Sequence, residues 1–183
     1  TPPHHHTATS PHRLTASPPY RTAPGPFYAR LNTAVTMLHD AGISVVVAAG
    51  NQRDDACLLS PASAPEAITV GATRSNDGLR RDSNFGSCVD ILAPGENIYA
   101  ASTQHDAAIA RKSGTSMACP HVAGAVAQLR GLHPDMTVST ASDTIMCMAT
   151  VGAVTGLRAS PPTPNRFLLG GKALTDLEGC APP

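Results

Sequence analysis

One serine stands where the sequence could place a nucleophile. Ser116 lies in the string 114–124 (GTSMACPHVAG), and the small and apolar residues that follow it predict a helix over 116–132. Unpaired backbone N–H groups and the positive end of the helix dipole stabilise the anion that forms when a hydroxyl attacks a carbonyl. The position therefore indicates acyl transfer at Ser116. Taken without the rest of the string, the same serine is more simply explained as a helix cap.

The elements around this string follow an α/β pattern. Apolar residues at helical spacing from Leu31 to Leu38 predict a helix that ends before Gly42. The nearly continuous apolar run 43–49 is typical of a strand buried on both faces of a parallel sheet. Further strands are predicted at 67–72 and 89–93, and a second helix at 138–150. Helix, tight turn and buried strand in this order predict an α/β domain.

The whole string 114–124 resembles the signature around the nucleophilic serine of subtilisin-like serine proteases. Other segments match this family in the same order, and the match covers roughly residues 31–169: 48–51 (AAGN), 60–63 (SPAS), 68–72 (ITVGA), 83–87 (SNFGS), 90–95 (DILAPG) and 164–166 (PNR). The similarity is closest to the proteinase K and aqualysin-like branch. It implies a subtilisin-like three-layer α/β fold with a parallel sheet, truncated because the N-terminal strands are absent.

The resemblance also implies site roles. Ser116 takes the position of the nucleophile, and Asn51 that of the residue whose amide completes the oxyanion hole. Ala48, Ala49 and Gly50 would line part of a broad apolar pocket for the substrate, a polypeptide. Without Ser116, a Gly-Asn pair after a strand would be read only as a turn.

A calcium site and a disulfide are implied in the same way. In this branch two backbone carbonyls and an aspartate bind a structural Ca²⁺, and these positions fall on Pro65, Ala67 and Asp90. Oxygen ligands suit such a hard cation. The alternative for Asp90 is a hydrogen-bonded carboxylate at a strand start. Cys57 and Cys88 coincide with a disulfide of the aqualysin-like members, which implies an oxidising, extracellular setting.

The sequence lacks the groups that would activate the serine. A serine hydroxyl needs a base, usually a histidine held by a carboxylate. The family supplies these from Asp-Thr-Gly and His-Gly-Thr-His segments, and neither occurs here. His121 would point about 140° around the helix from Ser116, and His39 precedes its strand at the wrong end. We therefore expect a fragment of a serine endopeptidase, inactive by itself, or alternatively an inactive remnant that binds a peptide or partner.

The other segments carry weaker signals. Residues 1–26 are rich in Pro, Thr, Ser and His and predict a disordered arm before a partial peptidase domain at 27–171 and a tail at 172–183. The adjacent His4, His5 and His6 could bind a transition metal, although biased composition is the simpler explanation of three neighbouring histidines. With 13 basic and 13 acidic residues and no long apolar run, the sequence predicts no nucleic-acid or membrane partner. We also expect a monomer.

Three cysteines have no role in the resemblance. Cys119 fits a small buried hydrophobe better than a second nucleophile, and Cys147 and Cys180 are left unassigned.

Overall fold

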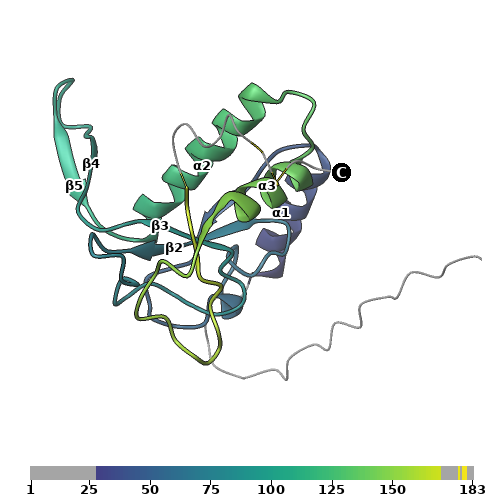
Figure 1. Cartoon of the computed structure of the whole chain (residues 1–183). Coiled ribbons are helices and arrows are strands. Elements are labelled where there is room, and N and C mark those ends of the chain that lie inside the picture. Colours follow the sequence, from purple (N-terminus) through teal and green to yellow (C-terminus); the bar gives the residue numbers. More distant parts are fainter. Residues whose placement is uncertain (1–27, 170–176, 178, 181–183) are drawn as a thin grey trace, which may run out of the picture.

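The computed structural model describes residues 28–169, 177 and 179–180. The arm expected at 1–26, with its histidines, lies outside the described residues, as does most of the tail. Figure 1 shows the arrangement of the elements, which run in the following order: α1 (Ala29–Asp40), β1 (Val46–Ala48), a short 3-10 turn (Ala56–Leu58), β2 (Ile68–Thr73), β3 (Ile91–Pro94), β4 (Ile98–Ala101), β5 (Ile109–Lys112), α2 (Thr115–Leu132), α3 (Val138–Met148), β6 (Thr150–Val151) and β7 (Arg166–Phe167).

The main sheet has the strand order β1-β2-β3-β7-β6. The first four strands are parallel neighbours, and β6 pairs antiparallel with β7. Every residue of β2 is buried, as expected for the central part of a parallel sheet that is covered on both faces. The carboxyl ends of β1, β2 and β3 therefore meet at one edge of the sheet.

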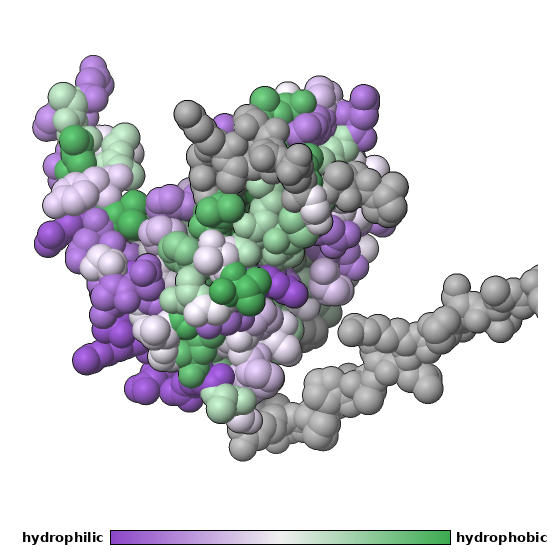
Figure 2. Space-filling view, in the orientation of Figure 1, coloured by the Kyte–Doolittle hydropathy of each residue, from purple (hydrophilic) through white to green (hydrophobic). Residues whose placement is uncertain are grey.

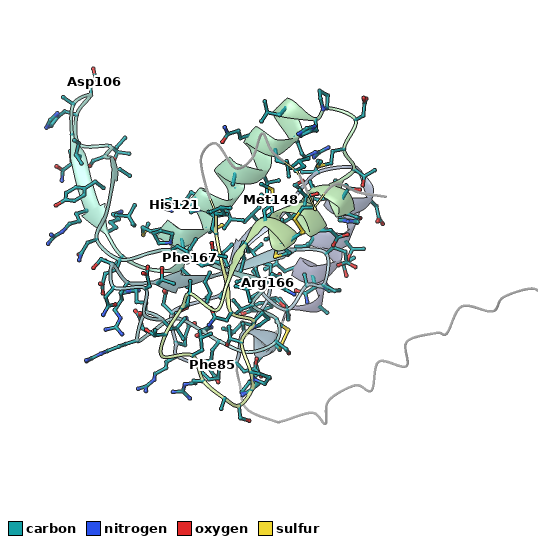
Figure 3. The ribbon with its side chains drawn as sticks, in the orientation of Figure 1. Phe85, Asp106, His121, Met148, Arg166 and Phe167 are labelled. Carbon is teal, nitrogen blue, oxygen red and sulfur yellow. A yellow bond between two sulfur atoms is a disulfide. The ribbon has the colours of Figure 1, made fainter. Side chains whose placement is uncertain are left out.

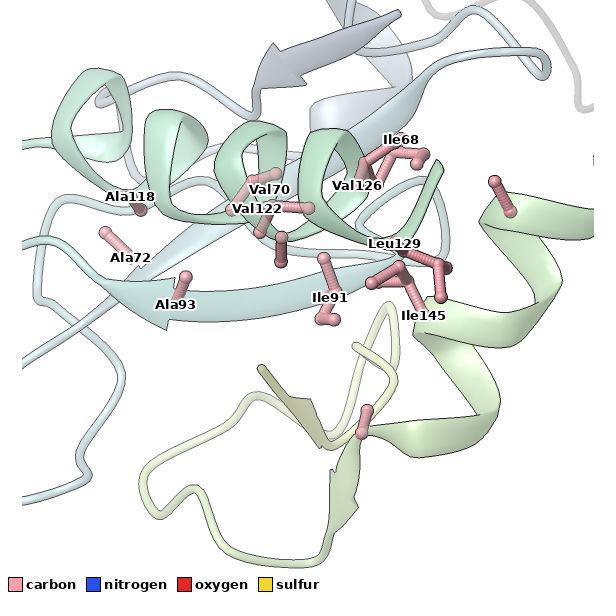
Figure 4. Close-up of a cluster of buried hydrophobic side chains, with 13 residues drawn as sticks. Ile68, Val70, Ala72, Ile91, Ala93, Ala118, Val122, Val126, Leu129 and Ile145 are labelled. Carbon is pink, nitrogen blue, oxygen red and sulfur yellow. The ribbon is translucent and has the colours of Figure 1, made fainter. Parts of the chain in front are cut away.

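Helices cover both faces of this sheet. On one face, α2 and α3 pack on β2 and β3 through the cluster drawn in Figure 4, which includes Ile91 and Leu129. Val46 contacts this cluster, whereas its neighbour Val47 packs with Val35 of α1 in another cluster. Successive strand side chains point to opposite faces. The result is a three-layer α/β arrangement.

Most predicted elements form, with shifted ends. The helices predicted at 116–132 and 138–150 are α2 and α3, and the strands at 67–72 and 89–93 are β2 and β3. The run 43–49 gives only the three-residue β1, because only Val46–Ala48 pairs with β2. The sequence also did not predict β4 and β5, an antiparallel hairpin that projects from the body in Figure 1 with Asp106 near its tip in Figure 3.

None of the helices within the described residues combines the length and apolar character that crossing a membrane requires.

Candidate active site

The loop after β1 places Asn51 at the carboxyl edge of the sheet. Ala48 is partly buried, Ala49 is buried, and Asn51 is exposed. Between them, Gly50 has φ +104°, and a Cβ there would lie 2.6 Å from Gln52 Oε1 and closer still to Asn84. A side chain at position 50 would be strained both by its backbone and by its neighbours. The glycine therefore allows the chain to turn sharply between the strand and Asn51.

The side chain of Asn51 is fixed against the start of α2. Its Oδ1 accepts hydrogen bonds from the Thr115 backbone N–H at 2.9 Å and from the Thr115 hydroxyl at 3.3 Å. In return, Thr115 Oγ1 accepts a hydrogen bond from the Gly50 N–H at 3.2 Å. Because the oxygen faces the helix, the Nδ2 donors of Asn51 are left for another acceptor. Among the described residues, no acceptor for Nδ2 is present.

Ser116 lies beside this amide in the first turn of α2. It is exposed, and its hydroxyl has no hydrogen-bond partner among the described residues. Gly114 has φ +149°, and a Cβ there would lie 3.3 Å from Asn51 Oδ1, so the glycine leaves room for the Asn51 side chain. Pro120 lies inside α2. Since proline has no N–H, the Ser116 carbonyl loses its intrahelical donor.

Asn84 fixes the loop that carries Asn51 through hydrogen bonds from the protein interior. It is fully buried. Its Oδ1 accepts hydrogen bonds from the backbone N–H groups of Gln52 at 2.9 Å and Asp54 at 3.0 Å. Its Nδ2 donates to the Ala49 carbonyl at 2.8 Å and to Gln52 Oε1 at 3.1 Å. One amide therefore satisfies polar groups on both sides of Asn51.

Asn84 and Thr115 are the site residues that sequence reasoning missed. Both stood inside quoted motifs, but neither received a role. Their signal was a polar residue among glycines and small residues, which is common in loops. Only the fold shows that these two side chains are buried and bonded to the loop that carries Asn51.

Neither of the two described histidines considered as bases forms a hydrogen bond with the serine hydroxyl. His121 donates a hydrogen bond from Nδ1 to the Met117 carbonyl at 2.8 Å, so its ring is turned back along α2 (Figure 3). His39 is at the end of α1, where Nε2 lies 3.2 Å from Ser139 Oγ. The other sequence candidates, His4, His5, His6 and His12, lie outside the described residues.

A cavity of about 230 Å³ brings together the residues expected to hold calcium. Pro65, Ala67 and Asp90 line it, together with Glu66 and Asp143 among others. Asp90 Oδ2 accepts a hydrogen bond from the Thr69 N–H at 2.8 Å, so the alternative reading of a hydrogen-bonded carboxylate also describes it. Burial raises the pKa of Asp90 to about 6, because the bond from Thr69 and the charge of Arg166 only partly offset desolvation.

The cysteines form two disulfides. Cys57 pairs with Cys88, with a Cα–Cα distance of 5.2 Å. Cys147 and Cys180, which sequence reasoning left unassigned, pair with each other across 5.7 Å. Cys119 is free and partly buried, and its thiol lies 3.4 Å from the Val46 carbonyl oxygen. Desolvation raises the pKa of the Cys119 thiol, which opposes formation of a reactive thiolate.

Known proteins are similar to this chain in sequence and in fold. Residues 15–168 match the model of the subtilase family. A cuticle-degrading serine protease of Arthrobotrys oligospora is 46% identical over 147 residues, which are 79% of this chain and 35% of that protein. The crystal structure of a cold adapted subtilisin-like serine proteinase superposes with a TM-score of 0.74 at 36% identity, covering 80% of this chain and 53% of the other.

The chain thus spans about a third of the length of that protease and about half of that of the crystal structure. The fold is subtilisin-like, with the parallel strands and covering helices described above. With most of its sequence matched and both relatives serine proteases, the chain belongs to the subtilase family of serine proteases.

Proposed function

We propose that the chain supplies the nucleophile and the oxyanion hole of a serine endopeptidase. One observation carries the proposal: the Thr115 N–H holds Asn51 Oδ1 at 2.9 Å, so that Asn51 presents its amide beside Ser116 at the start of α2. In this function Ser116 Oγ gives its proton to a base and attacks the carbonyl carbon of a peptide bond. The C–N bond then breaks, the amine leaves with that proton, and the acyl group stays on Ser116 until water hydrolyses it. The carbonyl oxygen, which becomes negative, accepts a hydrogen bond from Asn51 Nδ2.

The activating base belongs to polypeptide outside these 183 residues. The 183 residues contain no Asp-Thr-Gly or His-Gly-Thr-His segment. The His121 ring is bonded to the Met117 carbonyl, and His39 lies beside Ser139, so neither supports general base catalysis at Ser116. By itself the chain has at most the small residual rate that an oxyanion hole and binding supply without a base.

The substrate is a polypeptide. Proteases of the family act on polypeptides, and Ala48, Ala49 and Gly50 would form one wall of the pocket for the side chain before the cleaved bond. The two disulfides support an extracellular setting for this activity, as does the similarity to a cuticle-degrading serine protease.

The coding transcript tests the catalytic proposal. We expect in-frame Asp-Thr-Gly and His-Gly-Thr-His segments upstream of residue 31, and casein hydrolysis by the longer product that is lost in Ser116→Ala. A transcript without those segments, or a longer product whose Ser116→Ala variant hydrolyses casein equally well, would overturn it.

The second candidate is a catalytically inactive subtilase remnant that binds a peptide or a partner protein. The observation that favours it is the Ser116 hydroxyl, which has no hydrogen-bonded base among the described residues. It predicts no covalent labelling of the chain by a fluorophosphonate probe. Stoichiometric labelling that disappears in Ser116→Ala would exclude it.

A structural Ca²⁺ is part of the first proposal. The cavity is lined by Pro65, Ala67 and Asp90 together with Glu66 and Asp143, and carboxylate and backbone carbonyl oxygens are the donors that suit Ca²⁺. A cation there would also compensate the partly buried charge of Asp90, whose pKa is raised by desolvation. Millimolar CaCl₂ should raise the Tm of the chain relative to EDTA, and Asp90→Asn should remove the difference. Equal calcium effects in both proteins would refute the site.

A further inference from the structure

A second cavity, apart from the calcium cavity, is lined mainly by arginines. Its volume is about 190 Å³, and none of the described residues that line it is acidic. Hydrophilic residues gather at the lower left of Figure 2, over the blue and teal loops of Figure 1. The arginines come from three separate segments of the chain: Arg53, then Arg74, Arg80 and Arg81, and finally Arg158. We call these five residues the arginine cluster.

The arginine cluster concentrates positive charge in a chain that is neutral overall. The sequence has 13 Lys and Arg residues against 13 acidic ones, and five of the 13 line this one cavity. Within the described part of the chain, only Arg80 among them forms an ion pair, with Asp82 at 2.9 Å. The formal charge of the cluster with its partner is 5 − 1 = 4 positive charges. Such like charges repel unless an anion lies between them.

Two guanidinium donors in the cavity are buried without a hydrogen bond. They are Arg74 Nε and Arg80 Nη1. Arg80 Nη1 is close to the Asp82 carboxylate, yet neither atom is aligned for a hydrogen bond. Buried donors without an acceptor are uncommon in folded proteins. Arg74 Nε therefore has no acceptor among the described residues, whereas Arg80 Nη1 has the Asp82 carboxylate beside it.

Two of the arginines also have uncharged neighbours that define where the guanidinium group lies. The Arg158 guanidinium carbon lies 4.3 Å from the centre of the Phe85 ring, a stacking that orients the group without neutralising it. Arg74 lies over Gly78, where a Cβ would come within 2.8 Å of Arg74 Nη2. The glycine thus leaves the space that this guanidinium occupies.

We propose that the arginine cluster binds a polyvalent oxyanion of the phosphate or sulfate class. Each guanidinium presents a fork of N–H donors that matches the spacing of oxyanion oxygens. A charge of +4 favours a ligand with more than one negative charge. The cavity is smaller than the pockets that typically hold drug-sized ligands, which favours a compact ion or a terminal group.

The site is separate from the proposed chemistry and does not depend on it. In Figure 3, Phe85 lies at the lower end of the molecule, apart from His121 on α2. The cavity does border the loop that carries Asn51, because the Arg53 N–H donates to the Asp82 carbonyl at 3.0 Å. Oxyanion binding can therefore be measured whether or not Ser116 is active.

Calorimetric titration of the full chain with inorganic phosphate tests the proposal. Ionic strength is kept constant with NaCl, and sulfate is titrated in parallel. We expect saturation at one site, and a Kd about tenfold higher in Arg81→Gln and in Arg158→Gln, because each loses a charge-assisted hydrogen bond. Both side chains are exposed, so both variants should fold. The matched control is Arg111→Gln on the β4–β5 hairpin, which removes the same charge and should leave Kd unchanged.

Gly78→Ala separates defined geometry from general attraction. It keeps every charge but places a Cβ 2.8 Å from the present position of Arg74 Nη2, so the guanidinium must move. A several-fold rise in the phosphate Kd is expected, with a Tm close to that of the unmodified chain.

The proposal is overturned if phosphate does not saturate one site at constant ionic strength. It is equally overturned if Arg81→Gln and Arg158→Gln bind phosphate as the Arg111→Gln control does. Binding of a glutamate-rich peptide with no binding of phosphate or sulfate would also contradict it and would point to an acidic polypeptide instead.

Discussion

At the scale of single residues, the candidate site depends on two asparagines whose amide groups serve different purposes. Asn51 uses its oxygen to attach itself to Thr115 and leaves its nitrogen for a ligand. Asn84 uses both ends of its amide inside the protein. The first is exposed and the second is fully buried, so substitutions should affect activity in one case and stability in the other.

Asn51→Asp tests the oxyanion role with little change in shape. The remaining oxygen still accepts the Thr115 N–H, but the Nδ2 donor is lost. In the longer gene product we expect kcat for a peptide substrate to fall by about 10²–10³, with a smaller change in KM, because the lost bond forms mainly in the transition state. A kcat equal to that of the unmodified enzyme would remove Asn51 from the mechanism.

Asn84→Ala should destabilise the fold. The N–H groups of Gln52 and Asp54 and the carbonyl of Ala49 would lose their partner in a buried region. We expect a loss of about 3 kcal/mol in the free energy of unfolding, measured by urea denaturation. The control Gln128→Ala removes an exposed amide of α2 and should change this free energy by less than about 0.5 kcal/mol.

At the scale of elements, α2 connects the core to the site. Its first turn carries Thr115 and Ser116, while its last turns bury Leu129 completely against α3 and the sheet. Small residues such as Ala118 near its start let the helix approach β2 and β3 closely. The packing of the helix thus determines where the nucleophile lies relative to the loop after β1.

Leu129→Ala should therefore cost far more stability than the nearby Leu132→Ala. Leu129 is 0% exposed and would leave a cavity, whereas Leu132 is 47% exposed. We expect a loss of about 3 kcal/mol for the first and less than about 1 kcal/mol for the second, measured by thermal or urea unfolding. Similar losses for both would contradict the packing of α2 described here.

At the scale of the whole molecule, two disulfides connect segments distant in the sequence. Cys57–Cys88 closes a separation of 31 residues between the loop after β1 and the start of β3. Cys147–Cys180 closes a separation of 33 residues and attaches the end of the chain to α3. In the chain-entropy model both stabilise the fold mainly by restricting the unfolded chain.

Each disulfide should stabilise the protein by about 3 to 4 kcal/mol in the chain-entropy model. Cys57→Ser with Cys88→Ser, and separately Cys147→Ser with Cys180→Ser, should lower the free energy of unfolding by about this amount under oxidising conditions. Cys119→Ser is the control, because it removes a free thiol that closes no loop. If a reducing agent leaves the unfolding of the unmodified chain unchanged, the disulfides do not contribute.

The sequence by itself determined the helices, the buried strands and the family, because these follow from local periodicity and from the string around Ser116. It could not predict the pairing of Cys147 with Cys180 or the brace formed by Asn84, since such contacts join residues about 30 positions apart. The β4–β5 hairpin was missed because its exposed strands lack a buried face.

The five arginines come from three separate segments of the sequence and gave no signal there. Tertiary structure alone brought them to one cavity, because packing of the loops determines which distant charges become neighbours. Ser116 and Asn51 likewise lie 65 positions apart, and only the meeting of β1 and α2 at one edge of the sheet places them together.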